Sequence, residues 1–257
     1  MFAADRSRLI FPAMRFVIPL LGLAAIAWAA SVCSITWLDS DVTKIAARIV
    51  SGDRFRNDIW KSIESKFRNI SHQSVKPSVL AKLAIIQLRG VETVLSAENG
   101  GQVEPRLAEL TALSKAALRN TPTDGFLWLT LCWISERSGG TAADRWRLLR
   151  SSYRMSPNEG WIALKRNPFA LGRFTTLPDD LAEDAVRELI HLVRSRLHAE
   201  AAEIIAGPGL SINKLLLRRL KVLDQADRVI LAALLSSKNG FEDVARELGI
   251  EPPASRH

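Results

Sequence analysis

Cysteine and tyrosine are scarce in this sequence, with two cysteines and one tyrosine among 257 residues. Cys33 and Cys132 are too far apart for a two-cysteine zinc site. Because Cys33 also lies inside a long apolar run, we expect no disulfide to Cys132, which is interpreted as a small buried apolar residue. No stretch shows the two-residue alternation of half-buried strands, whereas apolar residues recur at spacings of three and four almost throughout. The sequence therefore predicts an all-α fold.

Recognisable catalytic motifs are also missing. The chain has no nucleophile elbow, no glycine-rich phosphate loop and no cysteine cluster. Glu188, His191 and His198 suggest a metal site, since Glu-x-x-His puts two ligands on one helical face. However, His191 and His198 fall on a polar stripe with Arg187 and Arg194, and arginines repel a metal ion. A solvated stripe is favoured, and we predict no catalytic residue, no metal, no cofactor and no enzyme.

The charge balance is basic, with 35 Lys and Arg against 27 Asp and Glu and a pI near 9.9. Such a balance suits nucleic acid, anionic lipid or an acidic polymer. Residues 241–250 are similar to the first helix and turn of a helix-turn-helix motif, but Pro252 and Pro253 leave no room for a recognition helix. We therefore expect no nucleic-acid partner.

One long hydrophobic run stands out against this background. From Phe16 to Leu38, 23 residues contain no charged residue, histidine, asparagine or glutamine. At about 1.5 Å per residue, a helix of this length reaches roughly 34 Å, enough to cross a bilayer core. Three arginines precede the run and two aspartates follow it, so the positive-inside rule places residues 1–15 in the cytoplasm. The sequence thus predicts a single-pass transmembrane helix in a bacterial inner membrane, with the C-terminal domain periplasmic.

A cleaved signal peptide is the competing interpretation of this run, because Ala27, Trp28 and Ala29 resemble a peptidase site. Secretory cores usually span about 7–15 apolar residues, so the length favours an uncleaved anchor. The alternative of cleavage stays open.

Beyond the run, helical periodicity divides the chain into four parts. Phe55, Ile59, Ile63 and Phe67 step by four along one face, which predicts juxtamembrane helices over residues 39–75. Residues 76–197 are predicted to form a repeat-like helical domain, 198–250 C-terminal helices and 251–257 a tail. The tryptophans of the repeat-like region are Trp128, Trp133, Trp146 and Trp161. They occur at helical spacing among leucines, which favours core positions over a ligand groove.

Two segments of the repeat-like region align with each other. Residues 117–124 and 152–159 each place a small or apolar pair before a polar turn, a proline and an acidic residue. The repeat-turn prolines, Pro122 and Pro157, are 35 residues apart, and each follows one apolar helix and precedes another. This region resembles the tetratricopeptide repeat, with a degenerate motif. Cys132 departs from the usual pattern, and Asn167 with Pro168 interrupts the third unit.

The chain as a whole resembles membrane-anchored accessory proteins of bacterial exopolysaccharide synthesis and export. The residues behind this resemblance are the anchor and segments 120–129 and 156–167. It implies a non-catalytic scaffold or accessory subunit in cell-envelope polysaccharide synthesis or export. The implied partners are membrane proteins of an envelope assembly, with the lipid bilayer and anionic polysaccharide as further partners. The alternative is an enzyme or binding protein that acts directly on an anionic glycan outside the cytoplasm.

Overall fold

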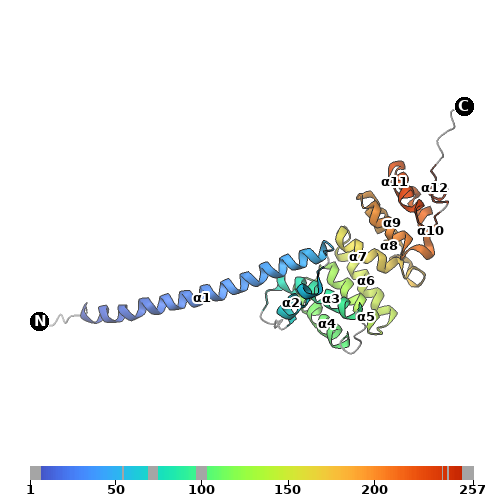
Figure 1. The fold of residues 1–257 in the computed structure, drawn as a ribbon. Coiled ribbons are helices and arrows are strands. Elements are labelled where there is room, and N and C mark those ends of the chain that lie inside the picture. The colour runs from blue at the N-terminus through green and yellow to red at the C-terminus, as the bar shows by residue number, and fades with distance from the viewer. Residues whose placement is uncertain are drawn as a thin grey trace. The chain divides into compact units, whose positions relative to one another are not determined.

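A computed structural model describes residues 7–53, 55–68, 75–96, 103–238, 240–241 and 243–250, without the side chains of 7–18, 29–38, 57, 68 and 78. The chain divides into two compact units, Met1–Glu98 and Asn99–His257. Every regular element in these described ranges is a helix (Figure 1). The predicted all-α class is therefore confirmed.

The first unit contains three helices, α1 (Ser7–Val50), α2 (Asn57–Arg68) and α3 (Pro77–Ser96). The C-terminal part of α1 packs on α3. Lys82 of α3 lies 3.2 Å from Asp39 of α1, and Lys66 of α2 lies 2.6 Å from Asp41. Ion pairs thus join both shorter helices to the part of α1 that follows the apolar run.

The structure contradicts the predicted transmembrane span from Phe16 to Leu38. Within the described residues, no helix has both the length and the apolar character that crossing a membrane requires. The span lies inside α1, which continues to Val50 through charged residues. Its described side chains run only from Pro19 to Trp28, whereas a span needs about 20 apolar residues. The remaining side chains of the predicted span, and residues 1–6 of the predicted tail 1–15, lie outside the described part.

Helix α2 buries only part of the predicted face, because Phe67 is buried, Phe55 and Ile63 are half-buried and Ile59 is exposed. Trp60 and Phe67 are 5% and 2% exposed, while Ile59 is 44% exposed. The ring of Phe55, which precedes the helix, lies 6.1 Å from that of Trp60. Trp60 was not part of the predicted stripe. The buried side of α2 includes Trp60 and leaves the adjacent Ile59 exposed.

The second unit consists of helices joined by short turns. Its longer helices are α4 (Val103–Asn120), α5 (Gly125–Arg137), α6 (Ala142–Met155), α7 (Gly160–Leu171), α8 (Asp179–Arg194), α9 (His198–Ala206) and α11 (Gln225–Ser236). The shorter ones are α10 (Asn213–Arg219), α12 (Val244–Glu247) and the 3-10 turns η3 (Phe174–Thr176), η4 (Leu210–Ile212) and η5 (Leu220–Val222). Neighbouring helices pack in the pairs α4 with α5, α5 with α6, α7 with α8, and α9 with α11.

The two repeat-turn prolines lie in turns between helices. Pro122 stands between α4 and α5, and Pro157 stands between α6 and α7. In both cases a glycine three residues later, Gly125 or Gly160, begins the next helix. The sequence predicts that Pro168 interrupts the third unit. In the structure, helix α7 continues through Pro168 to Leu171, so the helix is not interrupted there.

The predicted domain ranges stay predictions, but two structural facts bear on them. The division between the units falls inside the predicted repeat-like range 76–197. Helix α3 therefore belongs to the first unit. The C-terminal helices of the predicted range 198–250 belong to the second unit, and the predicted tail 251–257 lies outside the described residues.

Candidate binding site

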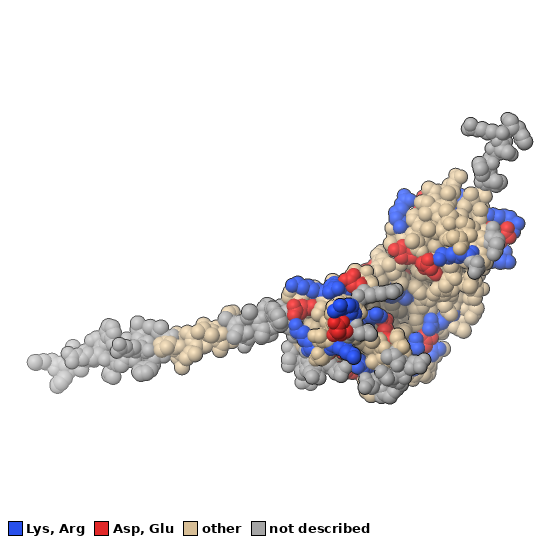
Figure 2. Space-filling model, viewed as in Figure 1, with Lys and Arg blue, Asp and Glu red and all other residues tan. Residues whose placement is uncertain are grey.

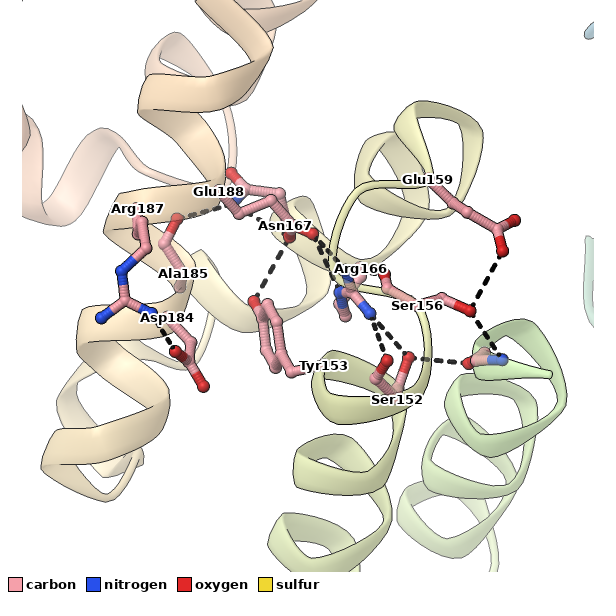
Figure 3. Close-up of polar contacts among 11 residues, drawn as sticks. Ser152, Tyr153, Ser156, Glu159, Arg166, Asn167, Asp184, Ala185, Arg187 and Glu188 are labelled. Carbon is pink, nitrogen blue, oxygen red and sulfur yellow. Dashed lines mark hydrogen bonds and ion pairs between the residues drawn. The ribbon is translucent and has the colours of Figure 1, made fainter. Parts of the chain in front are cut away.

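A buried arginine forms the centre of a polar cluster between α6, α7 and α8. Arg166 of α7 is fully buried, and its guanidinium has five N–H donors to satisfy. Nε and Nη2 donate to Glu188 Oε1 at 2.9 and 2.5 Å, and Nη2 also donates to the Ser156 carbonyl at 3.0 Å. Nη1 donates to the Ser152 carbonyl at 2.7 Å and to Ser152 Oγ at 3.1 Å. Every donor of the guanidinium therefore has a partner (Figure 3).

Glu188 of α8 is the counter-ion of this arginine. Its Oε2 accepts a hydrogen bond from the Tyr153 hydroxyl at 3.3 Å. The neighbouring Asn167 of α7 is also held to α8, because its Nδ2 donates to the Ala185 carbonyl at 2.7 Å. The Arg166 guanidinium carbon lies 4.1 Å from the centre of the Tyr153 ring. Burial raises the pKa of Glu188, and the nearby Arg166 charge partly offsets this rise. Burial also raises the pKa of Tyr153 well above its ordinary value. The cluster ties the end of α6 to both α7 and α8.

The cluster continues from α6 into the start of α5. Ser152 Oγ donates to the Gly125 carbonyl at 2.7 Å, and Ser156 Oγ accepts from the Gly125 amide at 3.1 Å. A β-carbon at Gly125 would lie 2.5 Å from that of Ser156, so only glycine allows this approach. Four successive helices are thereby connected through one set of buried hydrogen bonds.

A cavity of about 240 Å³ opens beside this cluster, between the start of α7 and the end of α8. The α7 side is lined by Pro157, Asn158, Gly160 and Ala163, and the α8 side by Glu188, His191, Leu192, Arg194 and Ser195. Glu188 therefore belongs both to the buried cluster and to the cavity wall.

The cavity lies at the start of a helix that is capped differently from its counterpart. In α5, the Asp124 side chain accepts from the amides of Phe126 and Leu127. In α7, Glu159 caps no amide and instead accepts from Ser156 Oγ and from the Trp161 indole. A β-carbon at Gly160 would meet nothing within 4 Å. The α7 start is thus left open where the α5 start is closed by serines.

Two basic side chains line the cavity and are available to a ligand. The side chains of His191 and Arg194 are both exposed, and within the described part of the chain neither side chain makes a hydrogen bond or an ion pair. Glu188 is already engaged by Arg166, so it does not neutralise the Arg194 guanidinium. Asn158 and Ser195 add neutral donors and acceptors at the same rim. The arrangement is suited to binding an acidic group through charge-assisted hydrogen bonds.

The structure corrects part of the predicted polar stripe. His191, Arg187 and Arg194 are exposed as expected, but His198 is 7% exposed, and its Nε2 lies 2.8 Å from Asp227 Oδ1 of α11. Helix α8 ends at Arg194, and the following turn breaks the helical phase, so His198 leaves the stripe. Among the described residues, no three metal-ligating side chains converge.

Other residues singled out in the sequence have mixed positions. Trp146 is buried, as expected for core, whereas Trp128, Trp133 and Trp161 are half-buried. Cys132 is buried, and burial raises its pKa to about 12. Arg166, the centre of the cluster, was not predicted as a site residue. The signal that could have found it is its helical spacing, because Arg166 lies four residues after Ile162 and three before Phe169, on the apolar face of α7.

The fold and the cavity define an all-α protein of helical hairpins with a small basic-rimmed pocket. Comparison with protein-family models, curated proteins and solved structures finds no significant match to this chain.

Proposed function

We propose that this protein is a non-catalytic scaffold or accessory subunit and that its second unit binds an acidic group of a partner protein in the cavity between α7 and α8. One observation carries the proposal. Arg194 and His191 line a cavity without an intramolecular counter-ion in the described structure, beside a buried cluster that fixes the helices around it. Stacked helical hairpins expose surfaces of the kind that bind other proteins.

A role in envelope polysaccharide synthesis or export depends on the sequence resemblance alone. The predicted periplasmic location was derived from the transmembrane span, and the correction of that span removes its basis.

Site-specific photo-crosslinking in cells tests the proposal on the full chain. A benzophenone amino acid at Asn158 lies at the cavity, and the same amino acid at the exposed Lys165 of α7 is the control. We expect a discrete adduct from position 158 that weakens at least tenfold in the Arg194→Glu variant, because a charge-assisted hydrogen bond contributes about 1.5–3 kcal/mol. Equal adducts from both positions, or an adduct insensitive to Arg194→Glu, would contradict it.

The same two basic side chains favour one second candidate, a protein that binds an anionic glycan. Purified full-length chain would then bind a polyuronate, and the affinity would fall steeply with salt and in the Arg194→Ala variant. Binding that ignores Arg194 would exclude this candidate.

A further inference from the structure

The outer face of α11 is apolar although it is exposed. We define the α11 stripe as Ala226, Val229, Ile230 and Ala233, which share one helical face by their spacing. All four are exposed, Val229 by 46% and Ile230 by 40%. The opposite side of the helix is also apolar, since Leu231 and Leu235 are fully buried. A helix that is apolar on both faces normally packs on both.

Both charged residues of α11 are turned toward partners within the chain. Asp227 is 3% exposed and lies 2.8 Å from His198 Nε2 and 3.2 Å from Arg196 Nη1. Arg228 Nη1 donates to the carbonyls of Leu248 and Gly249, both at 2.8 Å. The stripe is therefore left without a charge of its own, and Figure 2 shows a broad surface without Lys, Arg, Asp or Glu in the part of the second unit that carries α9 and α11 (Figure 1).

We propose that the α11 stripe binds the same stripe of a second copy of this chain, with the two helices antiparallel. The charge distribution supports this occupant. Each copy carries a net charge of +8, so two copies meet with the least repulsion on a face without charge. The stripe is such a face, and its neighbours along the helix, Gln225 and Ser237, are neutral.

The sizes of the side chains support the same arrangement. A two-fold interface must complement itself. If one residue contacts a second residue on the other copy, the second residue of the first copy makes the same contact in return. The stripe is symmetric about a point between Val229 and Ile230. In an antiparallel pair the two large residues meet their own copies at the centre, and Ala226 of one copy meets Ala233 of the other.

The area sets the strength of this contact. A helix of 12 residues is about 18 Å long, and a strip roughly 10 Å wide along it covers on the order of 200 Å². A standard interface buries about 800 Å² per partner. The stripe alone therefore gives a weak dimer that forms only at high protein concentration.

Cysteine cross-linking on the full chain tests the antiparallel register. In a Cys33→Ser background, Val229→Cys and Ile230→Cys should each give a disulfide-linked dimer under mild oxidation. Ala226→Cys and Ala233→Cys should each give several-fold less alone but should cross-link to each other when mixed. A cysteine at the exposed Glu200 of α9 is the control for random collision. Ala226→Cys cross-linking to itself indicates parallel helices, and Val229→Cys at the control level indicates no contact. Either result overturns the proposal.

Sedimentation tests the interface independently of the cysteines. Ala233→Glu introduces like charges that meet near the partner's Ala226, so it should abolish the concentration-dependent dimer. Ala199→Glu, at an exposed alanine of α9, should leave it unchanged. A chain that stays monomeric to about 1 mM, or a dimer that persists in Ala233→Glu, overturns the proposal. A cross-link from position 229 to a different protein in place of a second copy also overturns it.

Discussion

Replacing Glu188 with leucine should strongly destabilise the second unit. The substitution preserves volume but leaves the Arg166 guanidinium, which is 0% exposed, without its counter-ion. Two of the five N–H bonds of Arg166 lose their acceptor, and Tyr153 and Asn167 lose a shared carboxylate. Removing one partner of a buried ion pair costs about 3–5 kcal/mol. Against a usual total of about 5–15 kcal/mol, this is a large part of the stability.

The double variant Arg166→Met with Glu188→Leu separates the charge from the packing. A buried ion pair replaced as a whole by apolar residues is often nearly neutral in stability. Arg166→Met strands the carbonyls of Ser152 and Ser156, so we expect the double variant to recover most, but not all, of the loss.

The assay is urea unfolding of the full chain at neutral pH, followed by circular dichroism, for the wild type, both single variants and the double variant. The four free energies of unfolding give the coupling between the two side chains. We expect a coupling of about 2 kcal/mol or more. Single variants that each cost less than about 1 kcal/mol would refute the assignment of this pair as the fixed frame of the cavity.

Three further outcomes follow from the same structure. Gly125→Ala should cost about 1–3 kcal/mol by urea unfolding, because its β-carbon would lie 2.5 Å from a serine side chain. Gly160→Ala, which meets open space, should cost nothing measurable, and equal losses at both glycines would contradict the packing. Native Cys132 should resist iodoacetamide at mildly alkaline pH, since its pKa of about 12 leaves almost no thiolate, and rapid alkylation detected by mass spectrometry would refute its burial. Asp180, whose pKa is lowered chiefly by a hydrogen bond from an α6 arginine, stabilises the fold above the ordinary pKa of 3.8 and loses this contribution as pH falls through the lowered value. Asp180→Asn should therefore cost less than about 1 kcal/mol at neutral pH and nothing in strong acid, and a loss that persists there in urea unfolding would contradict the ion pair.

Local patterns predicted the helices well because periodicity and turn residues act over short distances. The spacing of apolar residues gave the all-α class, and Pro122 and Pro157 marked turns between helices. The same patterns failed where the outcome depends on distant residues. His198 was placed on a solvated stripe, and only the turn after Arg194 and the packing of α11 explain why it is buried against Asp227.

The structure also contradicts the transmembrane prediction. Hydropathy counted a run of 23 uncharged residues without regard to the helix that contains them. In the structure that run belongs to α1, whose charged C-terminal part is joined by ion pairs to α2 and α3. Within the described residues, no helix has the length and apolar character that a span requires.

The cavity shows why two similar turns end in different sites. Both helices that follow the repeat-turn prolines begin with glycine after an acidic residue, so local sequence treats them alike. The connection from α5 to α6 covers residues 138–141, whereas that from α7 to α8 covers 172–178 and is longer. The residues that face the glycine from the second helix also differ between the two hairpins. Ser152 and Ser156 close over Gly125, while Gly160 shares an open cavity wall with Leu192 and His191. The cavity thus accompanies a longer connection in the α7–α8 hairpin, and the glycine and acidic residue that both turns share do not distinguish the two hairpins.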